Sequence, residues 1–308
     1  MRIILDCSEF HIAERTAVAI GKFDGIHIGH QKLLARILEK KQDGFVACVF
    51  TFDPPPDVLF GKRTQKELTT REEKRMLFEK MGVDILIEFP LNKETAATLP
   101  EDFVKGILVE QMNTEFIAAG TDLAFGKNGA GNSELLIKMQ AECGFEVEII
   151  DKVCKDGREI SSTYVREAVA EGNMELAEEL LGEPFTVYGE VLHGNRLGRT
   201  LGMPTINQLP PENKLLPPFG VYYSEVEIDG NVYKGITNIG LKPTVNKGEG
   251  VGVETFIYNF NQDVYGDMVQ VRLFHFKRPE QKFDNVEALK KQIKSDVEDG
   301  LSYQHANE

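Results

Sequence analysis

Cysteine is scarce in this sequence, and long apolar segments are absent. The 308 residues include four cysteines, widely spaced and without a CxxC pair, so neither disulfides nor a zinc site are expected. The apolar stretch at the N-terminus is too short for a signal peptide. No run of about 18 apolar residues predicts a membrane span. We therefore expect a cytoplasmic protein without a membrane partner.

Positive charge is also in short supply. The sequence has 35 Lys and Arg against 49 Asp and Glu, which gives a formal net charge of -14. The average surface would repel a polyanion, so we expect no nucleic-acid partner, and any anion site must be built locally. No coiled-coil heptads or obvious interface patch appear, which leaves the oligomeric state open.

The first part of the sequence has the pattern of an α/β domain. The chain is too long for one ordinary core, so two domains are expected. Up to about residue 182, strand-like and helix-like segments alternate, which predicts a parallel sheet covered by helices on both faces. Ligands of such sheets bind at the carboxyl ends of the strands. The expected strands are residues 16–20, 45–52, 83–89, 114–120 and 145–150.

The remainder of the sequence has a different pattern. Short runs rich in β-branched and aromatic residues follow one another without helices, and 229–231 reads as a hairpin turn. These features predict an antiparallel barrel or sandwich. Helical periodicity returns only at 285–300. We expect an N-terminal domain over 1–182 and a C-terminal domain over 183–308.

The segment GKFDGIHIGH (residues 21–30) lies where the first buried strand passes into a helix. Its glycines allow the backbone to approach a ligand closely. His27 and His30 are three residues apart, so on the first helical turn they would point the same way. Two imidazoles beside a helix N-terminus suit a phosphate that gains charge in a transition state. The alternative is a capped helix with incidental polar residues.

This segment resembles the HxGH signature of the nucleotidyltransferases. The wider string GKFDGIHIGHQKLL resembles the first motif of the bacterial bifunctional riboflavin kinase / FMN adenylyltransferase (FAD synthetase) family. The resemblance implies a Rossmann-like N-terminal domain in which His27 and His30 are catalytic residues. The other ATP- and phosphate-binding residues that it implies in this motif are Gly21, Phe23, Asp24, Gly25 and Gly29.

Two further segments of the N-terminal half resemble motifs of the same family. GTDLAFGKNGAG (120–131) is similar to a flavin-contacting loop. ISSTYVRE (160–167) is similar to a segment that closes over the ATP phosphates, although taken alone it could simply be a Ser/Thr helix cap. The resemblance implies flavin-binding roles for Asp122, Phe125 and Gly126, and phosphate-binding roles for Ser161, Ser162, Thr163 and Arg166.

The C-terminal half opens with the glycine-rich, basic segment GEVLHGNRLGRTLGMPTIN (189–207). From chemistry alone, a phosphate cradle and plain barrel bends are about equally good interpretations. The segment resembles the riboflavin kinase module, whose PTxN motif implies Thr205 and Asn207 as ligands of Mg²⁺. The ATP-binding residues implied in the loop are Gly194, Arg196, Gly198 and Gly202.

The segment VETFIYNFNQDVYGD (253–267) resembles another riboflavin kinase motif. The resemblance implies that Glu254 is the catalytic base and that Asp263 and Tyr265 bind flavin. A carboxylate can accept the proton of a primary alcohol as the phosphorus–oxygen bond forms. Strand alternation would equally allow Glu254 to be a solvent-facing residue, and Asp263 with Tyr265 to be only a turn.

The resemblance covers nearly the whole chain, motif by motif. It implies a C-terminal β-barrel, with a terminal helix, that phosphorylates riboflavin to FMN with ATP. It implies an N-terminal domain that adenylylates FMN to FAD and releases pyrophosphate, with Mg²⁺ needed for both steps. The alternatives are a catalytically silent flavin-binding regulator, an enzyme with only one of the two activities, or a related enzyme that uses another triphosphate.

Overall fold

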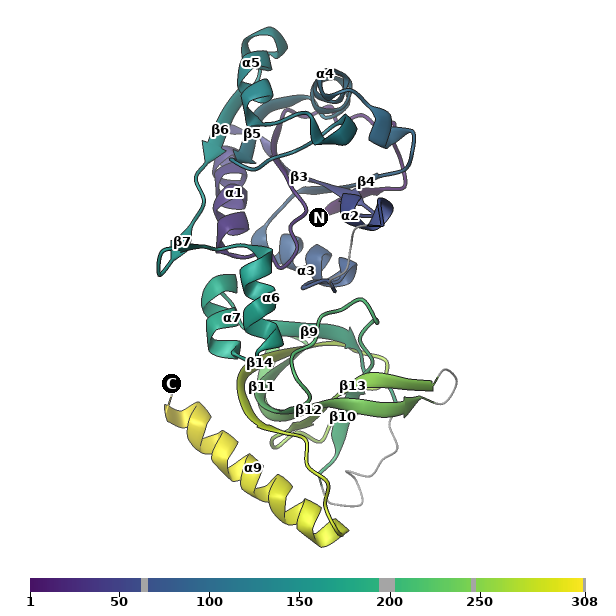
Figure 1. The fold of residues 1–308 in the computed structure, drawn as a ribbon, viewed down its shortest axis with the longest axis vertical. Helices are drawn as coiled ribbons and strands as arrows, with labels where there is room; N and C mark the ends of the chain where they lie inside the picture. The colour runs from purple at the N-terminus through teal and green to yellow at the C-terminus, as the bar shows by residue number, and fades with distance from the viewer. Residues whose placement is uncertain (62–65, 194–202, 245–247, 307–308) are drawn as a thin grey trace. The chain divides into compact units, whose positions relative to one another are not determined.

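The computed structural model describes residues 1–61, 66–193, 203–244 and 248–306. The chain divides into two compact units, Met1–Ser162 and Thr163–Glu308 (Figure 1). The second unit takes in helix α7 (Met174–Leu181), because α7 contacts strands of the C-terminal sheet. The domain boundary expected after residue 182 stays a prediction. No helix in the described part of the chain is both long and apolar enough to cross a bilayer.

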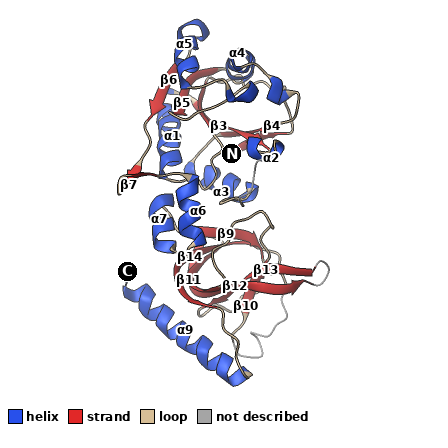
Figure 2. Ribbon diagram, viewed as in Figure 1, coloured by secondary structure: helices blue, strands red, loops and turns tan. Residues whose placement is uncertain are grey.

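The N-terminal unit is built on a six-stranded sheet in which every pair of neighbours is parallel. The parallel sheet predicted from the alternating pattern is therefore confirmed (Figure 2). In spatial order the strands are β1 (Arg2–Leu5), β4 (Ile85–Pro90), β3 (Val46–Asp53), β2 (Thr16–Ile20), β5 (Thr114–Gly120) and β6 (Glu146–Ile150). The edge strand β1 was not among the expected strands.

Alternate residues of each strand face opposite sides of this sheet, as strand geometry requires. On β2, Ala17 and Ala19 pack in one core cluster, while Val18 and Ile20 pack in the other. The first cluster is completed by α1 (Ile28–Glu39) and α3 (Arg71–Met81). The second is completed by the π-helix η3 (Phe103–Gln111) and α5 (Ser133–Cys143). Helices therefore cover both faces.

Local sequence signals fix where several helices begin and end. Thr70 and Glu73 form a capping box at the start of α3. Gly144 ends α5 in a left-handed conformation with φ 76°. The segment between β4 and β5 comprises the short helix α4 (Pro100–Asp102), which η3 follows directly.

The strand order places a topological switch beside β2. The chain runs from β2 to β3 and β4 on one side, and then returns to β5 on the other side. The loops that follow β2 and β5 therefore leave the same edge of the sheet next to each other. Such a switch point is where parallel sheets bind ligands.

The C-terminal unit contains a six-stranded antiparallel sheet that curls into a barrel. A bridge between Leu192 and Asn207 links its two edges, with the Leu192 N–H donating to the Asn207 carbonyl at 2.7 Å. Asp229 and Gly230 form the predicted hairpin turn with positive φ. In spatial order the strands are β10 (Thr205–Gln208), β13 (Gly248–Ile257), β12 (Asn231–Thr244), β11 (Gly220–Ile228), β14 (Met268–Pro279) and β9 (Phe185–Glu190).

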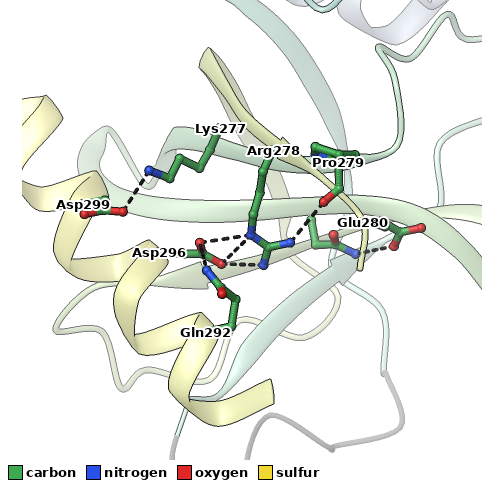
Figure 3. A network of polar contacts seen from close by, with 8 residues as sticks. Lys277, Arg278, Pro279, Glu280, Gln292, Asp296 and Asp299 are labelled. Atoms are coloured by element: carbon green, nitrogen blue, oxygen red, sulfur yellow. Dashed lines mark hydrogen bonds and ion pairs between the residues drawn. The ribbon is translucent and has the colours of Figure 1, made fainter. Parts of the chain in front are cut away.

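The terminal helix α9 (Val286–Ala306) packs against the barrel. Its Asp296 is 1% exposed and accepts hydrogen bonds from the Arg278 guanidinium, with Nη2 at 2.5 Å and Nε at 3.0 Å (Figure 3). Gln292, one turn earlier, also donates to Asp296 at 2.9 Å. This network fixes α9 on the strand that carries Arg278.

The remaining named elements are η1 (Lys40–Asp43), α2 (Pro56–Leu59), η2 (Thr95–Ala97), η4 (Lys127–Gly129), β7 (Cys154–Lys155), β8 (Arg158–Glu159) and α6 (Ser162–Ala170).

Candidate functional site

The loop after β2 turns sharply before α1 begins. Phe23 and Ile26 have positive φ values of 49° and 44°, and Gly25 has φ 86°. Phe23 is fully buried and Ile26 is 3% exposed, so burial of both side chains holds a backbone that L residues rarely adopt. The turn brings His27 to the N-cap of α1. The predicted strand-to-helix turn is present, and it lies at the switch point.

His27 and His30 lie against each other at the first turn of α1. Their ring centroids are 3.8 Å apart and the planes are inclined by 18°. The His30 backbone N–H donates to His27 Nδ1 at 3.4 Å, which leaves the His27 ring proton on Nε2. A Cβ at Gly29 would lie 3.1 Å from the His27 ring, so glycine makes room for the imidazole. The predicted pair therefore points the same way.

Burial keeps both imidazoles neutral near pH 7. It lowers the pKa of His27 to about 4, with Asp122 and Asp24 acting weakly in the opposite direction. Burial, and then the proximity of His27, lower the pKa of His30 well below its usual value. His30 Nδ1 is buried and has no hydrogen-bond partner among the described residues. A ligand that accepts N–H groups would meet two neutral donors beside the positive end of a helix.

Asp24 connects the GKFDGIHIGH motif through hydrogen bonds to the segment that precedes α3. It is 7% exposed, and its Oδ1 accepts hydrogen bonds from the backbone N–H groups of Leu68 and Thr69 at 2.9 and 3.1 Å. The Ser162 hydroxyl donates to the Asp24 carbonyl at 2.8 Å. The structure therefore brings Ser162 to the GKFDGIHIGH loop. Thr163 and Arg166 belong to the other compact unit.

The loop after β5 contains three of the five residues predicted to bind flavin. Asp122 is 75% exposed and lies close enough to His27 to act on its pKa. Phe125 is 2% exposed and packs on Phe103, with centroids 5.2 Å apart. Gly126 has φ 68°, and a Cβ there would lie 2.8 Å from Pro100 Cα. Phe125 is thus a core residue in this structure, and its flavin contact stays a prediction.

The barrel unit holds a second polar cluster around Glu254. On β13 this residue stands directly opposite Asn207 on β10 and Asn238 on β12. Directly opposed residues of antiparallel strands share one face. The Thr205 hydroxyl donates to Glu254 Oε1 at 2.6 Å. Thr205 and Asn207 from one predicted motif therefore meet Glu254 from another in a single cluster.

Lys242 of β12 completes this cluster, and sequence reasoning did not single it out. Its Nζ donates to Asn207 Oδ1 at 2.7 Å and also to Glu254 Oε2. A Cβ at Gly252 would lie 2.8 Å from Lys242 Cδ, so glycine lets the lysine stem cross β13. Lys242 lies four residues after Asn238, so the strand period of two would have placed both on one face.

These oxygen atoms fit a magnesium ion. A hydroxyl, an amide oxygen and a carboxylate are the ligand types that Mg²⁺ prefers. Thr205, Asn207 and Glu254 supply them within one hydrogen-bonded cluster. The Lys242 ammonium already sits against two of the three side chains, which shows that the cluster accommodates a cation.

Asp263 and Tyr265 lie in the turn between β13 and β14. The Tyr265 N–H donates to Asp263 Oδ1 at 3.2 Å, as in an Asx turn. The Tyr265 ring lies 3.9 Å from the His193 ring, centroid to centroid, at an angle of 34°. The turn is therefore next to the start of the glycine-rich loop. The predicted loop residues Gly194, Arg196, Gly198 and Gly202 lie outside the described residues.

Comparison with known proteins gives a match to a protein family in each half of the chain. Residues 9–164 match the family model described as FAD synthetase, and residues 181–303 match the one described as riboflavin kinase. Two curated relatives are named bifunctional riboflavin kinase/FMN adenylyltransferase. The relative from Listeria monocytogenes is 36% identical over 93% of this chain and 91% of its own. The relative from Haemophilus influenzae is 36% identical over 95% of each.

One solved structure is similar to this chain in fold as well as in sequence. A Streptococcus pneumoniae protein titled a macrolide-efflux protein is 31% identical, with a TM-score of 0.81 over 96% of this chain and 97% of that one. The two family-model matches and the relatives that align over almost their entire length agree with each other. The chain belongs to the bifunctional riboflavin kinase/FMN adenylyltransferase family.

Proposed function

We propose that this enzyme converts riboflavin to FMN and FMN to FAD, consuming one ATP in each step. The barrel unit transfers the γ-phosphoryl group of ATP to riboflavin, and the sheet unit transfers AMP to FMN and releases pyrophosphate. The observation that carries the proposal is that each compact unit has its own polar cluster suited to phosphate chemistry. One cluster holds His27 and His30, and the other holds Thr205, Asn207 and Glu254.

In the kinase step, Glu254 accepts the proton of the ribityl 5′-hydroxyl. The new oxygen–phosphorus bond forms as the bond from the γ-phosphorus to the bridging oxygen breaks, and ADP leaves. Thr205 supports this role, because its hydroxyl holds one carboxylate oxygen of Glu254 in place. Asp263 and Tyr265 would orient the flavin from the adjacent turn. Gly194, Arg196, Gly198 and Gly202 would contact the phosphates of ATP.

In the adenylyl step, an FMN phosphate oxygen attacks the α-phosphorus of ATP, and the bond to the β-phosphate oxygen breaks. His27 and His30 donate N–H groups to the phosphate oxygens that gain charge, together with the N-terminus of α1. Gly21, Gly25 and Gly29 allow the phosphates to approach the backbone. Phe23, Asp24 and Ser162 hold the loop, with Ser161, Thr163 and Arg166 as further phosphate contacts. Asp122, Phe125 and Gly126 are the proposed flavin residues.

Mg²⁺ would be held in the barrel by Thr205 and Asn207, where it neutralises phosphate charge when bound. A cytoplasmic location is part of the proposal, and the four free cysteines support it. The partners are then the small molecules ATP, riboflavin and FMN.

Incubation of the purified protein with riboflavin, ATP and Mg²⁺, followed by chromatographic separation of the flavins, tests the proposal. We expect FMN to appear first and FAD to follow, with ADP and pyrophosphate as the other products. Unchanged riboflavin, with flavin bound tightly, would identify a silent regulator instead. FMN without FAD, or FAD only from supplied FMN, would identify an enzyme with one activity.

A further inference from the structure

The Lys242 ammonium lies within the polar cluster formed by Thr205, Asn207 and Glu254. It lies 2.7 Å from Asn207 Oδ1 and also donates to Glu254 Oε2. The other carboxylate oxygen of Glu254 accepts from Thr205. The residues proposed to hold a divalent cation and to act as base therefore already surround a positive charge that the chain itself supplies.

The path of Lys242 to these oxygens is built into the barrel. Lys242 starts on β12 and must cross β13 to reach Asn207 on β10. Gly252, which is paired with Gly240 in the β12–β13 ladder, leaves the space that the lysine stem crosses. A Cβ at Gly252 would lie 2.8 Å from Lys242 Cδ, a distance at which the stem would have to move. The lysine side chain is only 25% exposed.

A tethered ammonium is a strong competitor for a free metal ion at such a site. The lysine is always present at a high effective concentration, because its stem is anchored on the neighbouring strand. Mg²⁺ loses its bound water reluctantly, so the ion alone gains little by displacing the ammonium. Nucleotide phosphates add oxygen ligands to the metal and anionic partners for the displaced lysine. A metal–nucleotide complex can therefore displace the Lys242 ammonium, whereas the metal ion alone cannot.

We propose that Lys242 is a resident counter-ion that keeps free divalent cations off Asn207 and Glu254 until a nucleotide arrives with the metal. The proposal rests on the kinase function proposed above. It makes Lys242 a positioning residue, which holds Glu254 and Asn207 together in the nucleotide-free enzyme. It also predicts ordered loading, in which the metal enters the barrel as its nucleotide complex.

A titration of the full chain with Mn²⁺ in the absence of nucleotide tests this inference. The signal of unbound Mn²⁺ in electron paramagnetic resonance gives the amount of metal bound. We expect Lys242→Met to bind Mn²⁺ at least about tenfold more tightly than the wild type, because a like charge is removed from the site. Lys242→Arg should bind it as weakly as the wild type. The control Lys234→Met, on the same strand, should change nothing. Adding Asn207→Ala to Lys242→Met should abolish the gain.

Equal or weaker Mn²⁺ binding by a folded Lys242→Met variant would overturn the proposal. Tight binding by Lys242→Arg would also overturn it, because the effect would then come from packing and not from charge. Should Lys242→Met fail to fold by circular dichroism, Lys242→Gln gives the same test with another neutral side chain. FMN formation by the wild type in the same preparation separates the two hypotheses. Its absence contradicts the kinase function, whereas its presence with unchanged Mn²⁺ binding contradicts only the role of Lys242.

Discussion

Glu254 accepts a hydrogen bond from the hydroxyl of Thr205 at 2.6 Å, between neighbouring strands of the barrel. This contact orients the carboxylate that is proposed to take the proton of the ribityl hydroxyl. Glu254→Gln keeps the shape of the side chain but removes the base. We expect FMN formation to fall by at least about 100-fold. FAD formation from supplied FMN should continue, because its cluster lies in the other compact unit.

Glu225→Gln on β11 is the matched control, and it should leave both activities unchanged. Both rates are measured by chromatography of the flavins. If a folded Glu254→Gln variant lost FAD formation as well, the assignment of one activity to each unit would be wrong.

The stacked histidines lead to the reciprocal prediction. The double variant His27→Ala with His30→Ala removes both ring donors beside the N-terminus of α1. FAD formation should fall by at least about 100-fold, and FMN should accumulate from riboflavin. His11→Ala, at an exposed histidine of the same unit, is the control. Normal FAD production by the folded double variant would rule out a catalytic role for the pair.

Burial of the same histidines predicts that acid destabilises the N-terminal unit. The pKa of His27 is lowered to about 4 in the folded state, so the unfolded chain takes up the proton first as the pH falls. By linkage, the free energy of unfolding decreases as the pH drops from about 6.5 toward 4, by up to about 3 kcal/mol for His27. Urea unfolding at several pH values in this window measures the loss. A variant with Gln at both positions should lose less stability than the wild type over the same window, and an identical pH dependence would contradict the prediction.

The ion pair between Arg278 and Asp296 holds α9 on the barrel (Figure 3). Asp296→Asn leaves a mostly buried guanidinium without a counter-charge, and should lower the free energy of unfolding by about 2–4 kcal/mol. Asp299→Asn is the control. Asp299 is 52% exposed and pairs with Lys277, so its loss should stay within about 0.5 kcal/mol. Equal effects of the two substitutions, measured by urea unfolding, would contradict this prediction.

Substitution of two glycines with similar φ values distinguishes the effect of backbone strain from the effect of steric overlap. Gly126 has φ 68° and Gly144 has φ 76°, but only at Gly126 would a Cβ meet other atoms, at 2.8 Å from Pro100 Cα. Gly144→Ala should lower the free energy of unfolding by about 1 kcal/mol. Gly126→Ala should cost at least about 2 kcal/mol, because strain and overlap act together. A smaller loss at Gly126 than at Gly144 would contradict this interpretation.

Local patterns of the sequence determined much of this protein. The strands β2 and β5, the capping box at Thr70 and the hairpin turn at Asp229 all follow from signals within a few residues. Such signals depend on backbone preferences and hydrogen bonds between near neighbours, so they can be read without knowing the fold. The spacing of His27 and His30 likewise fixed their common direction on α1.

Only the tertiary structure decided how distant segments meet. The strand order that puts the loops after β2 and β5 side by side, and the pairing of β10 with β13, depend on burying apolar surface over a whole unit. For the same reason the sequence did not predict that Phe125 is buried in the core, or that Lys242 reaches Glu254. The sequence therefore predicted which residues are candidates for the chemistry, and the fold decided which of them touch.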